Sequence, residues 1–92
     1  MNAQDLINLL QLQLPNATID AANEGNKFDV RVIDDSFEGK RLVARQQVIL
    51  ALVKDKIASG EIHALNIQAL THAEWQVKQQ AQQISHARHH HK

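Results

Sequence analysis

His63 is the residue with the clearest potential for metal chemistry. It lies in the segment IHALNIQALTHAEW, residues 62–75, and is the only histidine inside a regular apolar alternation. An imidazole near a strand end can offer one ring nitrogen to a metal while a neighbouring acceptor orients the other. From the residues alone, the alternative is a packed histidine whose ring bonds to backbone or water, which is the commoner role of an isolated histidine.

Three basic residues, Lys40, Arg41 and Arg45, follow Gly39 and could contact phosphates from the first turns of a helix. The alternative is an ordinary solvated face, because 10 basic and 10 acidic residues leave the chain without net charge. A Gly-x-x-Gly clamp is missing, and two Phe and one Trp provide few stacking platforms for bases. Any DNA binding through this face is therefore expected to be weak, steeply salt-dependent and lost when Lys40, Arg41 and Arg45 are neutralised.

The chain has no cysteine, so it can form neither a disulfide nor a thiolate metal site of its own. If an iron–sulfur cluster is involved, partners must supply the thiolates. Ser36, Ser59 and Ser85 lie in expected loops or at element ends without an adjacent base, so we expect no nucleophilic catalysis and no enzyme activity. No stretch has the length of a membrane span, and we expect a soluble cytoplasmic protein.

The elements that must position these residues follow from the apolar spacing. Leu6, Leu9 and Leu10 predict an amphipathic helix that begins with a cap at Asn2 and ends at Pro15. The segments NATIDAAN and KFDVRV alternate as strands around the turn EGN, which predicts a hairpin. In the second strand, Phe28, Val30 and Val32 should face the core.

A long helix is predicted from Lys40 to Ser59, with Gly60 ending it and Leu42 and Val43 among its core positions. Residues 62–70 then form a strand that should pair in parallel, because a helix connects it to the hairpin. Thr71 and Glu74 form a predicted capping box at the start of the last helix. We expect one domain over residues 1–83 and a flexible His-rich tail over residues 84–92.

The segments FEGKRLVARQQVI, IHALNIQALTHAEW and GNKFDVRV resemble the BolA family, over residues 4–80. The Arg-Gln-Gln run at residues 45–47 is similar to the IbaG-like subgroup. The resemblance implies an α+β fold with the element order αββααβα, related to type II K-homology domains, in which a three-stranded mixed sheet packs against helices. This order agrees with the elements derived above.

The resemblance also implies a function. BolA-like proteins pair with monothiol glutaredoxins and share a [2Fe-2S] cluster with the glutaredoxin and glutathione, so the expected protein is a monomer alone and a heterodimer with its partner. His63 matches the family's histidine ligand, whereas Lys27 stands where relatives often carry a second ligand. We expect Lys27, Gly60, His63 and Trp75 at the partner surface, although the place of Trp75 in the sequence favours a partly buried anchor of the last helix over an interface contact. The leading hypothesis is a non-enzymatic adaptor in iron homeostasis or stress response; the alternative is a DNA-binding transcriptional regulator.

Overall fold

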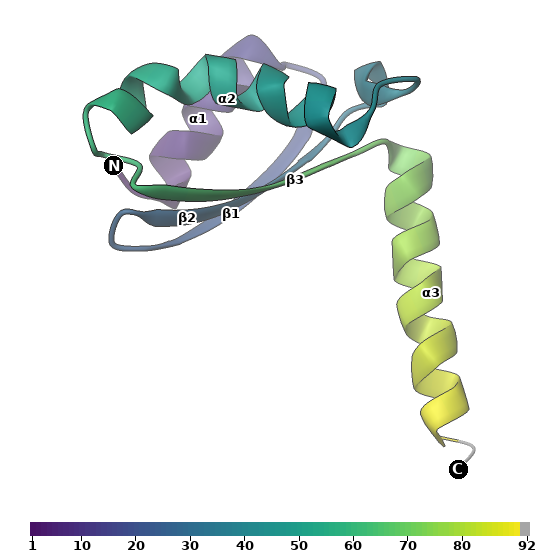
Figure 1. The fold of residues 1–92 in the computed structure, drawn as a ribbon. Helices are drawn as coiled ribbons and strands as arrows, with labels where there is room; N and C mark the ends of the chain where they lie inside the picture. Colours follow the sequence, from purple (N-terminus) through teal and green to yellow (C-terminus); the bar gives the residue numbers. More distant parts are fainter. Residues whose placement is uncertain (91–92) are drawn as a thin grey trace.

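A computed structural model describes the backbone of residues 1–90 and the side chains of residues 1–81. The fold is α+β, with a three-stranded mixed sheet, and has the expected element order (Figure 1). The extra turn before the long helix is a short 3-10 helix. In chain order the elements are α1 (Ala3–Gln13), β1 (Thr18–Glu24), β2 (Lys27–Ile33), η1 (Asp35–Phe37), α2 (Leu42–Ala58), β3 (Ala64–Leu70) and α3 (His72–His90).

The sheet has the strand order β1-β2-β3, with an antiparallel β1–β2 hairpin and a parallel β2–β3 pair, as predicted. Gly25 and Asn26 form the two-residue turn of the hairpin, and Gly25 has a φ of 58°. A positive φ at the first turn position is the conformation for which such tight hairpins favour glycine. The parallel pairing places the first residues of β2 and β3 side by side, with Lys27 opposite Ala64.

One face of the sheet carries the core, and α1 and α2 lie over it (Figure 1). The predicted core residues of β2 are confirmed: Phe28, Val30 and Val32 are all buried. The capping box of α1 is also present, since the Asn2 side chain accepts a hydrogen bond from the Asp5 N–H and the Asp5 carboxylate accepts one from the Asn2 N–H. In the described part of the chain, the opposite face of the sheet is exposed; we call it the open face.

The long helix differs from its prediction at its first turn. It begins at Leu42, and its buried row is Arg45, Ile49 and Val53. Leu42 and Val43 were predicted core positions, but they are 63% and 65% exposed. The four-residue spacing of the buried row turns both residues away from the sheet. At the other end the prediction is confirmed, because Gly60 follows the helix with a φ of 85°.

The last helix starts as predicted and then leaves the body of the molecule (Figure 1). The Thr71 N–H donates to Glu74 Oε1 over 2.9 Å, and the Glu74 N–H donates to Thr71 Oγ1 over 3.2 Å, which confirms the capping box. The predicted tail, residues 84–92, begins within α3; its side chains and all of residues 91–92 lie outside the described part of the structure. No described helix is both long enough and apolar enough to cross a membrane.

Candidate functional site

His63 lies between the buried Ile62 and the first residue of β3. The strand starts two residues later than predicted, at Ala64, so His63 belongs to the connection from α2. Its backbone N–H donates a hydrogen bond to the carbonyl oxygen of Asn26 over 2.8 Å. The side chain is exposed, and its ring makes no hydrogen bond with any described residue. The backbone of His63 is therefore anchored to the hairpin turn, while the ring is exposed and forms no hydrogen bond with a described residue.

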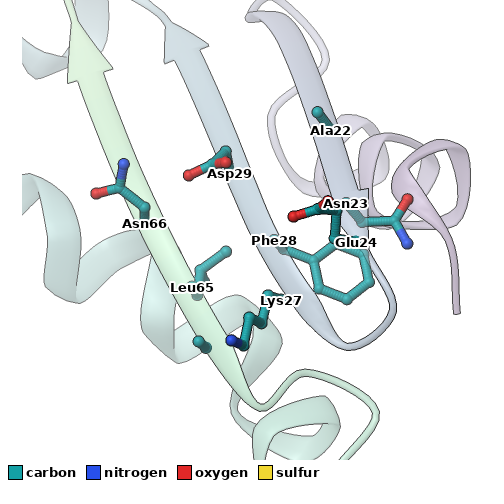
Figure 2. A pocket seen from close by; sticks show the side chains of 9 residues that line it. Ala22, Asn23, Glu24, Lys27, Phe28, Asp29, Leu65 and Asn66 are labelled. Atoms are coloured by element: carbon teal, nitrogen blue, oxygen red, sulfur yellow. The ribbon is translucent and has the colours of Figure 1, made fainter.

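Lys27 is brought next to this connection by the register of the sheet. It pairs with Ala64, the residue that follows His63, and it begins β2 directly after Asn26. Lys27 is exposed and forms no ion pair with a described residue. Two segments more than 30 residues apart in the chain thus meet at one end of the sheet, and Figure 2 shows Lys27 there beside β3. A protonated amine has no lone pair for a metal, so Lys27 is not an iron ligand near neutral pH.

The end of α2 supplies the third side of this region. Gly60 is exposed just after the end of α2. Lys56, before it in the sequence, and Glu61, after it, form an ion pair with 3.3 Å between Nζ and Oε2. Hydrogen bonds from Lys56 and then from Ser59 hold the pKa of Glu61 below its usual value. The charges of Lys56 and Glu61 are therefore paired with one another, whereas Lys27 forms no ion pair and the His63 ring forms no hydrogen bond with a described residue.

The structure does not bring Trp75 to this region. Trp75 is in the first turn of α3, beyond the far end of β3, and the seven residues of that strand span roughly 20 Å. Its ring lies against the guanidinium of Arg31, whose central carbon is 4.2 Å from the ring centroid. Of the four predicted partner residues, Lys27, Gly60 and His63 lie at one end of the sheet and Trp75 lies at the other.

His72 is also at the far end of β3, remote from His63. Its backbone N–H and its ring Nδ1 both lie 3.1 Å from Asp35 Oδ1. The backbone hydrogen bond and then the ring contact lower the pKa of Asp35. This histidine links η1 to α3. It lies too far from His63 to supply the second ligand that relatives often carry at the position of Lys27. No group of three or more metal-binding side chains occurs among the described residues.

Arg45 is not on an exposed basic face, which corrects the expectation for this residue. Its side chain is 5% exposed, and its two terminal nitrogens bind the two Glu74 oxygens over 2.5 and 3.1 Å. Arg45 also donates to the backbone oxygens of Lys40 and Ala69. Because it belongs to the buried row of α2, its guanidinium joins α2, β3 and α3 and is not available to a phosphate.

Lys40 and Arg41 are the exposed members of the predicted basic group. They precede α2, with Arg41 as its N-terminal cap, and do not lie on its first two turns as predicted. Because Arg45 is buried, the exposed basic group consists of two adjacent cations in the loop before α2.

The backbone carbonyl of Asn26 anchors the backbone N–H of His63. No side-chain pattern in the sequence predicts this contact, because every residue carries a carbonyl.

The fold and this geometry can now be compared with known proteins. The family model described as BolA-like protein matches residues 11–74, which is more than half of the chain. The chain belongs to the BolA family. This confirms the family expected from the three quoted segments, and the matched range includes His63 and Lys27.

Two bacterial relatives resemble this BolA protein over most of their length. A protein from the rpoN-murA intergenic region of Acinetobacter guillouiae is 44% identical over 75 residues, which cover 82% of this chain and 90% of the relative. The acid stress protein IbaG of Escherichia coli is 34% identical over 70 residues, which cover 76% of this chain and 79% of IbaG. The relation to IbaG agrees with the subgroup that the Arg-Gln-Gln run indicated.

Solved structures show the same fold. The BolA domain of SufE1 from Arabidopsis thaliana superposes with a TM-score of 0.69 at 30% identity, covering 78% of this chain and 93% of that domain. A BolA homologue from Coxiella burnetii gives a TM-score of 0.74 at 22% identity, covering 83% of this chain and 97% of the homologue. The α+β fold of this BolA protein is therefore that of its family.

Proposed function

We propose that this BolA protein is a non-enzymatic adaptor that binds a monothiol glutaredoxin and, through His63, helps to hold or hand on a [2Fe-2S] cluster. The observation that carries the proposal is the exposed imidazole of His63, whose backbone N–H is anchored to the Asn26 carbonyl at one end of the sheet. A ring in this position can approach a metal held by another protein without any rearrangement of the sheet.

The residues present fit a shared cluster and not a resident one. The chain has no cysteine, and the region around His63 offers one imidazole. Iron–sulfur clusters need thiolate ligands, so the glutaredoxin and glutathione would provide them. When bound, an imidazole in place of a thiolate raises the reduction potential of such a cluster. A raised reduction potential suits a cluster that is transferred to another protein or used as a sensor.

The partner surface follows from the same geometry. It consists of the hairpin turn with Lys27, the end of α2 at Gly60, and His63, all exposed at one end of the sheet. Trp75 is excluded by its distance from this end, along β3. The name of the relative IbaG, an acid stress protein, supports a role under stress. DNA binding is the weaker candidate, because Arg45 is buried in an ion pair.

An isotope-labelled sample titrated with apo glutaredoxin, cluster-loaded glutaredoxin and duplex DNA tests the proposal. We expect amide shifts in residues 25–27 and 60–64 with glutaredoxin, and broadening at His63 only with the cluster-loaded form. Trp75 serves as the internal control, and its indole signal should stay in place. Shifts confined to the Trp75 end of the sheet, or no response to either glutaredoxin, would contradict this assignment.

A further inference from the structure

The open face of the sheet contains two kinds of charged row. In one row Asp20 lies opposite Arg31, and the two side chains form an ion pair. Arg31 is also covered by Trp75, so each charge of this row has a partner within the protein, although the buried Nε of Arg31 has no hydrogen-bond partner among the described residues. The neighbouring rows, nearer the hairpin turn, contain Glu24 opposite Lys27 and Asp29 beside Asn66. Unlike Asp20 and Arg31, these four side chains are not paired with one another.

Glu24, Lys27, Asp29 and Asn66 form no side-chain hydrogen bond or ion pair with any described residue. This is notable because Lys27 has Glu24 as its direct cross-strand neighbour and Asp29 two residues along its own strand. Opposite charges at such positions normally attract one another. Here the unpaired groups all border one hollow of about 550 Å³ (Figure 2).

The hollow exists because two of its positions carry small side chains. Ala22 lies opposite Asp29 on β1, and Ala64 lies opposite Lys27 on β3. Both alanines line the hollow, together with parts of Phe28 and Leu65. A volume of this size is in the range that holds small-molecule ligands. The polar groups are therefore arranged around an open space of ligand size and not around one another.

The charges of the hollow select the ligand. A simple anion would meet Lys27 but also the carboxylates of Glu24 and Asp29, and a simple cation would meet the ammonium of Lys27. A zwitterion satisfies both signs. Lys27 and Asp29 are two strand residues apart, about 6.6 Å between their backbones. An ammonium and a carboxylate on the same carbon atom can bridge this spacing with one charge-assisted hydrogen bond of about 2.8 Å at each end.

We propose that this hollow binds the α-amino-acid end of a small molecule, with the ligand's carboxylate at Lys27 and its ammonium at Asp29 and Glu24. The Asn66 amide would donate a further hydrogen bond to the ligand carboxylate. Two sources carry this chemistry: a free amino acid, and the γ-glutamyl end of glutathione. The inference does not rest on the proposed function, because it requires neither iron nor a partner protein.

Titrating the labelled full chain with four probes tests the ligand class: alanine, reduced glutathione, N-acetylalanine and alaninamide. Alanine or glutathione should shift the amides of residues 22–29 and 64–66, whereas the two blocked forms of alanine, which each lack one charge, should bind more weakly. If alanine alone, or both alanine and glutathione, shift these amides, a free amino-acid group is sufficient for binding. If only glutathione shifts them, the site binds the γ-glutamyl peptide. No localised shift with either, or equal shifts with the blocked forms, overturns the proposal.

Variants locate the site. Lys27→Gln and Asp29→Asn should each weaken binding about twofold to fivefold, which is the range for one exposed ion pair. Lys54→Gln and Asp55→Asn are matched controls, because they make the same charge changes at exposed positions on α2. The controls should bind as the parent protein does. Equal affinity in the hollow variants and the parent, or equal loss in the controls, would overturn the assignment to this hollow.

Discussion

The backbone N–H of His63 is bonded to the carbonyl of Asn26 over 2.8 Å, and this contact joins the end of α2 to the hairpin turn. It positions the imidazole without using either ring nitrogen. Metal binding at this end of the sheet should therefore depend on the His63 ring. The place of His63 relative to the hairpin turn should depend on the register of β2 and β3.

Replacing His63 by alanine should change or abolish the visible absorption of a cluster assembled with glutaredoxin, glutathione and iron, because an iron ligand is lost. His72→Ala is the matched control, since His72 is an exposed histidine at the far end of β3. The control should keep the spectrum of the parent protein. An unchanged spectrum and cluster lifetime in His63→Ala would refute the ligand role.

The Arg45–Glu74 ion pair should make a measurable contribution to stability, because Arg45 is buried. Glu74→Gln keeps a side chain that can still complete the capping box but removes the negative charge. We expect the free energy of unfolding to fall by about 1.5–2 kcal/mol, the lower part of the range of about 1.5–3 kcal/mol for a hydrogen bond to a charged group, because Glu74 is partly exposed. Urea unfolding would measure it, with Glu38→Gln, an exposed control, within about 0.5 kcal/mol of the parent.

Acid should weaken the attachment of α3. Hydrogen bonds from Arg45 and then from Thr71 hold the pKa of Glu74 below its usual value of 4.5. Because the folded-state pKa is lowered, this stabilisation is complete above pH 4.5 and is lost as the pH falls through the folded-state value. Melting temperatures measured from pH 7 downwards should therefore fall less steeply for Glu74→Gln than for the parent in this acid range. Parallel curves would contradict the assignment.

The salt dependence of any DNA binding should be shallower than the three-residue basic group predicted, because Arg45 is buried. Only Lys40 and Arg41 of the predicted basic group are exposed, and two phosphate contacts give a slope of log affinity against log salt of about −1.8. Fluorescence polarisation with a labelled duplex at several salt concentrations would measure this slope. A much steeper slope that survives Lys40→Gln and Arg41→Gln together would show that another surface binds the DNA.

Much of the fold could be predicted from the sequence because local signals agreed with tertiary packing. Thr71 and Glu74 stand at the correct spacing for a capping box, and the structure contains both hydrogen bonds. The alternation of Phe28, Val30 and Val32 identified the buried face of β2. A helix between two strands implied their parallel pairing. The capping box and the alternation involve positions that are close in the sequence, whereas the parallel pairing follows from the order of the elements.

The predictions that were wrong concern which side of an element faces the core. Arg45 was assigned to the surface by its charge, although it is four residues from Ile49 and eight from Val53, which form the buried row with it. Leu42 and Val43 were assigned to the core by their hydrophobicity and are exposed. Only the partners at Glu74 and Ala69, distant in sequence, make burial of a guanidinium possible. For this helix, the four-residue spacing from Ile49 and Val53 predicted burial better than the hydrophobicity or charge of each residue.

The separation of Trp75 from His63 likewise depended on tertiary structure. The two residues flank β3 in the sequence, and the extended strand places them at its opposite ends. Lys27 is much farther from His63 in the sequence, but parallel pairing makes it a neighbour. Strand register, and not distance along the chain, determined which predicted residues share a surface.

The hydrogen bond that positions His63 uses a carbonyl oxygen, and all twenty amino acids have one. Residue 26 could therefore be exchanged without displacing the imidazole, and the side chain of the next residue could change from a metal ligand to an ammonium while the sheet stays intact. A protein built in this way can alter the chemistry beside its histidine by single substitutions in a two-residue turn and its flank. The position of the ring and the character of its surroundings are thus free to evolve independently.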